Sequence, residues 1–255
     1  MIKIKNNRNG GSLFHYAHFL CDCLFPEIIN DIFKYDIVIR EKNIHQTIGN
    51  FNKIYTDVMT TKNHELLYKE FNKLNINTIS YEKKEKYCDK LYFDKFRNFI
   101  FSKYKINHLE YNSSYPEAIL IKRANRIDLI DDEYLKNLNT NINTGKERRE
   151  INNIEMVEAF LINKYNDKFK SLYFENMSFE EQVLYFNNAK LIICAHGAVM
   201  SNMFFCKEQT KIIEVTCGVS WEFFDKMSNI LNLTHVKCTV NDYNTIIHCI
   251  NQNEL

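Results

Sequence analysis

The amino-acid sequence predicts an α/β protein made of two Rossmann-like domains that face each other across a cleft. In both halves of the chain, short apolar runs typical of strands alternate with stretches whose apolar residues recur at helical spacing. The run 191–195 lacks polar alternation, which is typical of a strand covered on both faces in a parallel sheet, and 211–215 gives a second apolar strand that ends in an acidic residue. At 255 residues the chain is long enough for two compact domains of about 100 to 130 residues each.

The composition is that of an ordinary globular protein, with 45% apolar residues and a formal net charge of +1. A chain this close to neutrality gives no reason to expect nucleic acid as a partner. No window approaches the run of about 20 apolar residues that spans a membrane, and residues 1–11 lack the apolar core of a signal peptide. We therefore expect a soluble, cytoplasmic protein without a membrane span. Abundant Asn, Lys, Ile, Tyr and Phe are typical of AT-rich coding, as in a protist, a low-GC bacterium or a large DNA virus, and the last of these would place the protein in a host cytoplasm.

The eight cysteines mostly lie inside apolar runs and show no CxxC spacing. Without secretion or paired ligand spacing, a disulfide framework or a zinc site is the less favoured interpretation. We expect buried free thiols.

The first domain is predicted to span residues 1–115. Residues 14–33 show apolar residues at helical spacing, and a polar stretch at 112–116 forms the natural boundary. The expected elements are an edge strand at 1–5, strands at 36–40, 77–81 and 87–93, and helices at 14–33, 64–74 and 95–104.

The second domain is predicted to span residues 116–240, followed by a C-terminal helix within 241–255. Residues 129–150 are polar, with almost no core pattern, and are expected to form a surface loop. The start of the helix at 178–189 reads Ser-x-x-Glu, which matches a capping box. The other expected elements are strands at 118–122, 170–174, 191–195, 211–215 and 235–240, and helices at 152–165, 221–231 and 242–251.

The stretch 178–215 is the part of the sequence on which a functional prediction depends. His196 and Gly197 end the apolar strand 191–195, and a short helix follows through small residues. Backbone N–H groups at the start of such a helix point toward the carboxyl edge of the sheet, where anions bind well. Glu214 ends the next strand at the same edge, where α/β folds keep their ligands. The sequence therefore predicts an anion-binding βα turn.

The order of residues in this stretch closely resembles glycosyltransferase family 61. The family pattern is a Ser-Phe-x-Glu-Gln-like helix start, then His-Gly-Ala-Gly-Leu-Thr-Asn, then a strand ending in Glu. Upstream, AILIKR at 118–123, an Arg-x-Ile-x-Asn-x-x-Glu segment that starts at Arg149, and HYAHFLCDCLFPEI at 15–28 also resemble the family. The residues that match in the central block are Ser178, Phe179, Glu181, Gln182, His196, Gly197, Ala198, Asn202 and Glu214.

The resemblance implies a GT-B architecture and a glycosyltransferase, a hexosyl- or pentosyltransferase. It would move a sugar from a nucleotide-sugar, most simply a UDP-sugar, to a hydroxyl of a glycan or glycoprotein by inverting displacement. No DxD-like pair stands at a predicted strand end, since Asp131 and Asp132 lie in the polar stretch, so we expect metal independence and no cofactor beyond the co-substrate. The C-terminal helix would pack back on the first domain, and a homodimer is compatible with this picture.

An alternative stays open, because Val199 and Met200 replace the Gly-Leu of the family turn and Ser201 replaces Thr. Loss of the second glycine removes a position at which a phosphate can approach the backbone closely. A non-catalytic nucleotide- or carbohydrate-binding protein of the same fold is therefore the second hypothesis.

The donor site is predicted at the carboxyl half. Arginine offers a planar five-donor fork that suits phosphate, and a transferase without a metal needs a cation for the leaving diphosphate. The same residues could instead be solvated surface charges or ordinary first-turn residues of a helix, and Glu214 could bond ribose hydroxyls or cap a helix. The candidates are Lys122, Arg123, Arg149, Asn152, His196, Gly197, Ala198, Ser201, Asn202 and Glu214.

The acceptor side is predicted in the amino half, where His18 and Asp22 lie one helical turn apart. A carboxylate paired with a histidine can act as general base near neutral pH, so Asp22 is the predicted base and His18 its partner. A merely structural His–Asp bond is the alternative. A metal site with His15 would lack a fourth ligand, so no metal is predicted.

Overall fold

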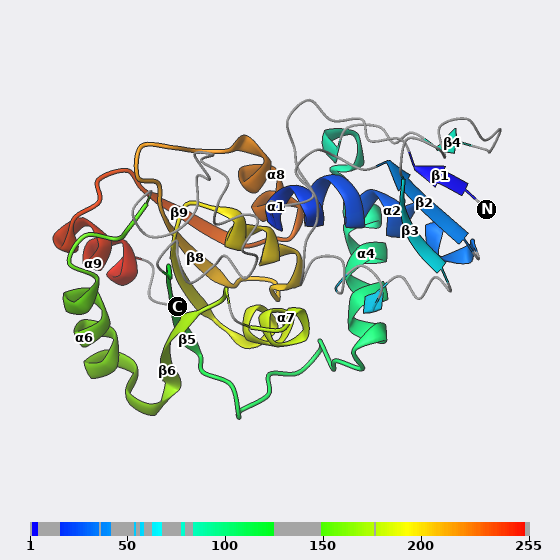
Figure 1. Cartoon of the computed structure of the whole chain (residues 1–255). Coiled ribbons are helices and arrows are strands. Elements are labelled where there is room, and N and C mark those ends of the chain that lie inside the picture. The colour runs from blue at the N-terminus through cyan, green and yellow to red at the C-terminus, as the bar shows by residue number, and fades with distance from the viewer. Residues whose placement is uncertain are drawn as a thin grey trace. The chain divides into compact units, whose positions relative to one another are not determined.

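The computed structural model describes residues 2–4, 16–35, 37–41, 54, 57–58, 63–67, 78–79, 84–124, 149–175 and 177–252. The chain divides into two compact units, Met1–Lys105 and Ile106–Leu255. Each unit has its own parallel sheet (Figure 1). The α/β class predicted from the alternation of strands and helices is therefore confirmed.

The C-terminal unit is built on a five-stranded sheet in the order β6-β5-β7-β8-β9, and every neighbouring pair is parallel. From β5 the chain first adds β6 on one side and then crosses back to add β7 on the other side. The direction of winding therefore reverses between β5 and β7. In open α/β sheets such a switch point leaves a crevice at the carboxyl ends of the two strands, where ligands bind. The strands are β5 (Ala118–Lys122), β6 (Phe169–Tyr173), β7 (Leu191–Ala195), β8 (Lys211–Val215) and β9 (Thr234–Cys238).

Helices cover both faces of this sheet (Figure 1). On one face lie α6 (Ile154–Tyr165) and α9 (Tyr243–Asn251). On the other lie α7 (Phe179–Asn188), the 3₁₀ helix η8 (Ala198–Phe205) and α8 (Glu222–Ile230). Two covered faces explain why β7 and β8 read as continuous runs, since every residue of both strands is buried.

The two faces differ in chemistry. The face under α6 and α9 is mainly apolar, and its core includes Ile193 and Ile213 together with Val157 and Ile246 from the helices. The face under α8 carries Glu214, which is fully buried. A buried carboxylate thus lies on the face of the sheet that α8 covers.

Local signals fix the helix ends of the C-terminal unit. The predicted capping box is confirmed, because the Ser178 side chain accepts from the N–H of Glu181 and the Glu181 carboxylate accepts from the N–H of Ser178. Asp242 caps α9 by accepting from the N–H of Thr245. At the other end of α9, the buried Lys211 ammonium donates to the carbonyl oxygens of Ile250 and Gln252.

The N-terminal unit contains a four-stranded parallel sheet in the order β3-β2-β1-β4. The predicted edge strand at 1–5 is β1 (Ile2–Ile4), but it pairs with strands on both sides, so the edge position is wrong. Its Ile–Lys alternation is what an edge strand shows, yet the backbone partners on both sides decide its place. The other strands are β2 (Ile37–Glu41), β3 (Asn63–Leu67) and β4 (Thr78–Ile79).

Two elements predicted in the N-terminal unit are wrong. The start of the helix expected at 64–74 is strand β3, because pairing with β2 overrides its helical spacing. The strand expected at 87–93 is instead a 3₁₀ turn, η4 (Lys84–Tyr87), and the first turn of α4 (Lys90–Lys103), where the Asp89 side chain caps the helix.

The helix expected at 14–33 is a series of shorter elements. It contains α1 (Tyr16–His18), the π-helix η1 (Phe19–Leu24), α2 (Phe25–Ile29) and the 3₁₀ turn η2 (Ile32–Lys34). Phe25 packs edge-on against Phe93 and Phe96 of α4, which ties this segment to α4. The polar stretch predicted at 129–150 lies almost wholly outside the described residues.

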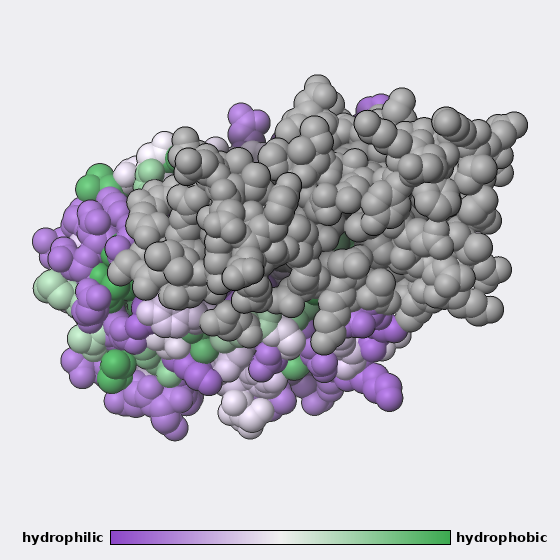
Figure 2. Space-filling view, in the orientation of Figure 1, coloured by the Kyte–Doolittle hydropathy of each residue, from purple (hydrophilic) through white to green (hydrophobic). Residues whose placement is uncertain are grey.

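The described surface of the C-terminal unit is mainly hydrophilic in the view of Figure 2, with small separate apolar areas. Among the helices that the structure describes, none combines the length and the apolar character needed to cross a bilayer. All eight cysteines are free thiols, and six of them are buried, as predicted.

The capping box generates a prediction that separates side-chain hydrogen bonding from the helix dipole. Glu180 and Glu181 are both exposed in the first turn of α7, but only Glu181 bonds to the backbone of Ser178. Glu181→Ala should therefore lower the free energy of unfolding by about 0.5 to 1 kcal/mol more than Glu180→Ala. Chemical denaturation of the two variants, followed by circular dichroism, measures this difference. Equal losses would show that the dipole alone stabilises this end of α7.

Candidate functional site

The candidate site lies where β5 and β7 end, at the switch point of the sheet. Arg123 follows the last residue of β5, and His196 and Gly197 follow β7. These positions come from segments about seventy residues apart in sequence, and the parallel pairing of β5 with β7 brings them to one edge.

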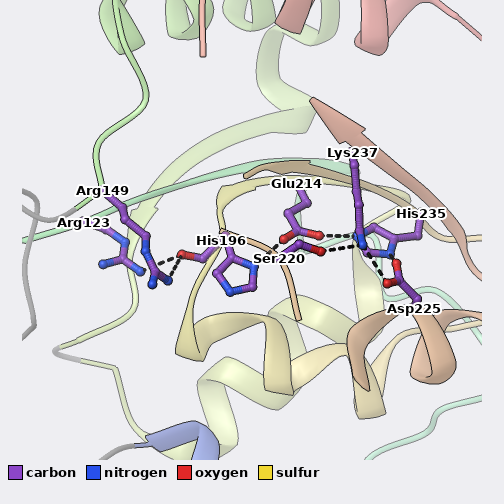
Figure 3. Close-up of polar contacts among 8 residues, drawn as sticks. All are labelled: Arg123, Arg149, His196, Glu214, Ser220, Asp225, His235 and Lys237. Carbon is purple, nitrogen blue, oxygen red and sulfur yellow. Dashed lines mark hydrogen bonds and ion pairs between the residues drawn. The ribbon is translucent and has the colours of Figure 1, made fainter. Parts of the chain in front are cut away.

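Two arginines converge on one backbone oxygen at this edge. Arg123 Nη2 and Arg149 Nη1 each donate to the carbonyl oxygen of His196, both at 3.0 Å. Figure 3 shows the two guanidinium groups side by side at this oxygen. An anion with several oxygens can accept hydrogen bonds from both planar guanidinium forks. The arrangement is suited to a phosphate or diphosphate.

Gly197 makes room for one of these arginines. A Cβ atom built at this position would lie 2.0 Å from Arg123 Nη2 and 3.2 Å from its Cζ. The backbone of Gly197 is extended, with a φ of 166°, so conformation alone does not require glycine. The requirement is space, because any side chain here would displace the guanidinium group.

Glu214 is the centre of the polar cluster beside the arginines. Its side chain is 0% exposed, and each carboxylate oxygen is bonded to an imidazole. His196 Nδ1 contacts Oε1, and His235 Nε2 lies 2.8 Å from Oε2 (Figure 3). Burial would raise the pKa of Glu214, but the hydrogen bonds from His196 and His235 outweigh it and lower the pKa to about 2. Glu214 is therefore an ionised, buried carboxylate, and the predicted contact with ribose hydroxyls stays a prediction.

The cluster continues to the surface through residues that the sequence reasoning missed. His235 Nδ1 lies 3.5 Å from Asp225 Oδ1, and Lys237 Nζ bonds to Asp225 Oδ2 at 2.6 Å and to Ser220 Oγ at 2.9 Å. The available signal was register, since His235 pairs with Ile212, two residues before Glu214 on the neighbouring strand. Residues two apart on a strand share a face, so a correct alignment of β8 with β9 would have placed this histidine beside Glu214.

Two of the predicted donor-site residues do not join this cluster. Lys122 donates to Glu158 Oε2 of α6 at 2.8 Å and lies 5.6 Å from the centre of the Tyr173 ring. Asn152 bonds through its backbone N–H and side chain to Asn241, which follows β9. Both have structural partners, and their contact with a donor stays a prediction.

The residues predicted in the turn after Gly197 are mostly buried. Ala198 begins η8 and is half-buried, whereas Ser201 and Asn202 are fully buried. Asn202 Nδ2 donates to Gln182 Oε1 at 3.1 Å, which joins η8 to α7. Ser201 Oγ has no hydrogen-bond partner in the part of the chain that the structure describes. Phosphate contacts by these three residues also stay predictions.

The predicted acceptor-side pair is formed in the N-terminal unit. His18 Nδ1 lies 2.6 Å from Asp22 Oδ2, and Lys84 Nζ donates to Asp22 Oδ1 at 2.7 Å. Burial acts to raise the pKa of Asp22, but the bonds from His18 and Lys84 and the charge of Lys84 together lower it. The pair lies at the start of the π-helix η1, a rare element that is often found at functional sites. His15 lies outside the described residues, and within those residues no group of three or more potential ligands could hold a metal.

The family model described as Glycosyltransferase 61 matches residues 16–213, a range that contains Asp22, both arginines and the β7 turn. The comparison with curated proteins found no match.

The buried carboxylate generates a prediction about stability and pH. The pKa of Glu214 is about 2 in the folded chain and about 4.5 ordinarily, so its contribution is complete above pH 4.5 and is lost as pH falls toward 2. Glu214→Gln should lower the free energy of unfolding at neutral pH by an amount on the order of 3 kcal/mol, and the difference should shrink below pH 4.5.

Fluorescence of Trp221, the single tryptophan of the chain, reports this transition because it packs 4.8 Å from Phe224 in the same unit. Glu222→Gln, at an exposed glutamate of α8, is the matched control. A pH-independent difference between wild type and Glu214→Gln would contradict an ionised Glu214.

Proposed function

The chain belongs to the glycosyltransferase 61 family, and on this premise we propose that it transfers a sugar from a UDP-sugar to a hydroxyl of a glycan or glycoprotein. The proposed transfer inverts the anomeric carbon and needs no metal ion. The single observation that carries the proposal is the convergence of Arg123 and Arg149 at the switch point of the sheet.

The arginine pair supplies what a leaving nucleoside diphosphate requires. When the bond between the anomeric carbon and the diphosphate oxygen breaks, negative charge develops on the phosphates. Two guanidinium groups that are already held at this edge can stabilise that charge without reorganisation. His196 and Gly197 complete the proposed donor site, with Asn152, Ala198, Ser201, Asn202 and Lys122 as outer members.

The reaction also needs a group that takes the proton of the acceptor hydroxyl. The oxygen of that hydroxyl attacks the anomeric carbon from the face opposite the diphosphate, the new C–O bond forms, and UDP leaves. We assign the proton to the His18–Asp22 pair. Within the pair Asp22 is the proposed base and His18 the partner that orients it.

A GT-B arrangement, in which the donor and acceptor units face each other, is part of the proposal. It is supported by two parallel sheets on separate units and by the placement of the two candidate pairs on different units. Such an arrangement would bring the acceptor from the N-terminal unit to the donor held by the C-terminal unit.

A second candidate is a non-catalytic nucleotide-binding protein of the same family. The observation that favours it is Val199 and Met200 in place of the family's usual Gly-Leu, in a turn that runs straight into a largely buried helix. Incubation of the purified chain with UDP-sugars distinguishes the two, because a binding protein leaves the donor intact with or without an acceptor.

Replacing Arg123 tests the donor site directly. Arg123→Ala should weaken UDP binding by roughly 1.5 to 3 kcal/mol, the loss of one charge-assisted bond. Isothermal titration in the presence of EDTA measures this loss and at the same time tests binding without a metal. Lys226→Ala, which removes one exposed positive charge from α8, should bind UDP as the wild type does.

A second variant shows whether the effect comes from the position of the guanidinium. Gly197→Ala should displace Arg123 and cause a similar loss, and the double variant should lose little more than either single one. Unchanged affinity in Arg123→Ala would remove this arginine from the donor site.

Replacement of the His–Asp pair tests the acceptor side. Asp22→Asn and His18→Ala should each lower kcat by about 10² to 10⁴, with UDP affinity nearly unchanged. Because the residues act as a unit, the double variant should be no slower than Asp22→Asn by more than a few-fold. Steady-state kinetics with titration of UDP separates the two effects. Full turnover in both single variants would place the base elsewhere.

A further inference from the structure

The imidazole of His196 is hydrogen-bonded through only one of its two nitrogens among the described residues. Its Nδ1 is bonded to Glu214, and the ring packs against Phe224 with 5.7 Å between ring centres. The side chain keeps 7% exposure, and the second nitrogen, Nε2, has no hydrogen-bond partner among the described residues. Figure 3 shows this nitrogen on the side of the ring that faces away from Glu214. A nearly buried ring with one nitrogen fixed and one nitrogen without a partner is arranged to contact a ligand.

The carboxylate decides which nitrogen of each ring carries a proton. Because Glu214 is ionised, it can only accept hydrogen bonds. His196 must then carry its proton on Nδ1, and His235 must carry one on Nε2, an assignment that follows from the hydrogen-bond network. A neutral His196 in this form presents Nε2 as a hydrogen-bond acceptor.

His235 keeps the carboxylate in place. It bonds the oxygen of Glu214 that His196 leaves unused, and its other nitrogen faces Asp225 of α8. Lys237 fixes Asp225 in turn. The orientation of His196 therefore depends on a chain of bonds anchored in β8, β9 and α8.

The imidazole of His196 and the two arginines are suited to different parts of a ligand. Both arginines donate to the backbone oxygen of His196, so two positive charges already stand beside this residue. Their planar, charged guanidinium groups are better suited than an imidazole to bind phosphate.

We propose that Glu214 and His235 are positioning residues, which hold His196 with its proton on Nδ1 so that Nε2 accepts a hydrogen bond from a hydroxyl of the nucleotide-sugar. This inference rests on the proposed function. It assigns two parts of the nucleotide-sugar to two different sets of residues. Arg123 and Arg149 bind the phosphates, and His196 reads a hydroxyl of the ribose or of the transferred sugar.

The position of the proton can be measured without a ligand. Nitrogen NMR of the full chain labelled with ¹⁵N-histidine, with His196→Gln used to assign the signal, should show a protonated Nδ1 and an unprotonated Nε2 at neutral pH. His235→Phe removes a bond to Glu214 and should alter this signal. His235→Gln keeps a donor toward Glu214 and should restore it. His248→Phe, at an exposed histidine of α9, should leave it unchanged.

Binding then identifies the hydroxyl. His196→Ala should weaken binding of the nucleotide-sugar roughly 3- to 10-fold, as expected for one lost neutral hydrogen bond. If the partner is a ribose hydroxyl, UDP should lose as much, and 2′,3′-dideoxy-UDP should lose nothing. If the partner belongs to the sugar, only the nucleotide-sugar should lose affinity. His235→Phe should also raise KM for the nucleotide-sugar, because His196 is then less well oriented. His235→Gln should bring KM most of the way back to the wild-type value.

Three results would overturn the proposal: a His196 ring protonated on both nitrogens, a measurable loss of affinity in His196→Ala that is the same for UDP and its dideoxy form, or wild-type affinity for the nucleotide-sugar in that variant. Failure of the proposed function has a different signature, since wild-type protein would then bind no nucleotide at all.

Discussion

The C-terminal unit depends on a charge that has been placed inside a protein sheet. Removing an ionised carboxylate from water costs several kcal/mol unless hydrogen bonds replace its hydration. Glu214 obtains these bonds from two imidazoles on neighbouring segments, and burial together with this charge raises the pKa of the adjacent Cys194 thiol to about 12. The carboxylate thus fixes the relative positions of the end of β7, the start of β9 and, through His235 and Asp225, helix α8. In the sequence Glu214 is only a polar residue in an otherwise apolar strand end, but in the structure its bonds hold the candidate site together.

Several of the residues that match the glycosyltransferase 61 pattern contact one another in the structure. These contacts give a structural reason for finding both members of each pair in the sequence. Gly197 leaves space for Arg123, and the backbone oxygen of His196 receives both arginines. Other contacts join two secondary-structure elements or cap a helix, and these residues need no catalytic role to account for them. The remaining partnered pairs are Ser178 with Glu181, Gln182 with Asn202, and His196 with Glu214.

Sequence reasoning predicted well where a pattern is local. The apolar runs of β7 and β8 and the Ser178 capping box needed only spacing and composition, and the His18–Asp22 pair needed only helical proximity. It failed where a distant partner decides. Strand β3 is set by pairing with β2, and Lys84 reaches Asp22 across 62 positions.

The candidate site shows the same limit. Residue types and family resemblance predict Arg123, Arg149 and His196 as site residues. The parallel pairing of β5 with β7 brings Arg123 to the His196 oxygen, and Arg149 reaches the same oxygen from the segment before α6. His235 was missed because no local pattern marks a histidine on a half-buried strand, and only the register with β8 reveals it.

The attachment of the last helix to β8 has a practical consequence for anyone handling this protein. Lys211 ties the carboxyl end of α9 to the strand on which Glu214 lies three residues later. A purification tag fused directly behind this helix, or a trimmed expression boundary that removes it, would act on the strand that carries the buried carboxylate.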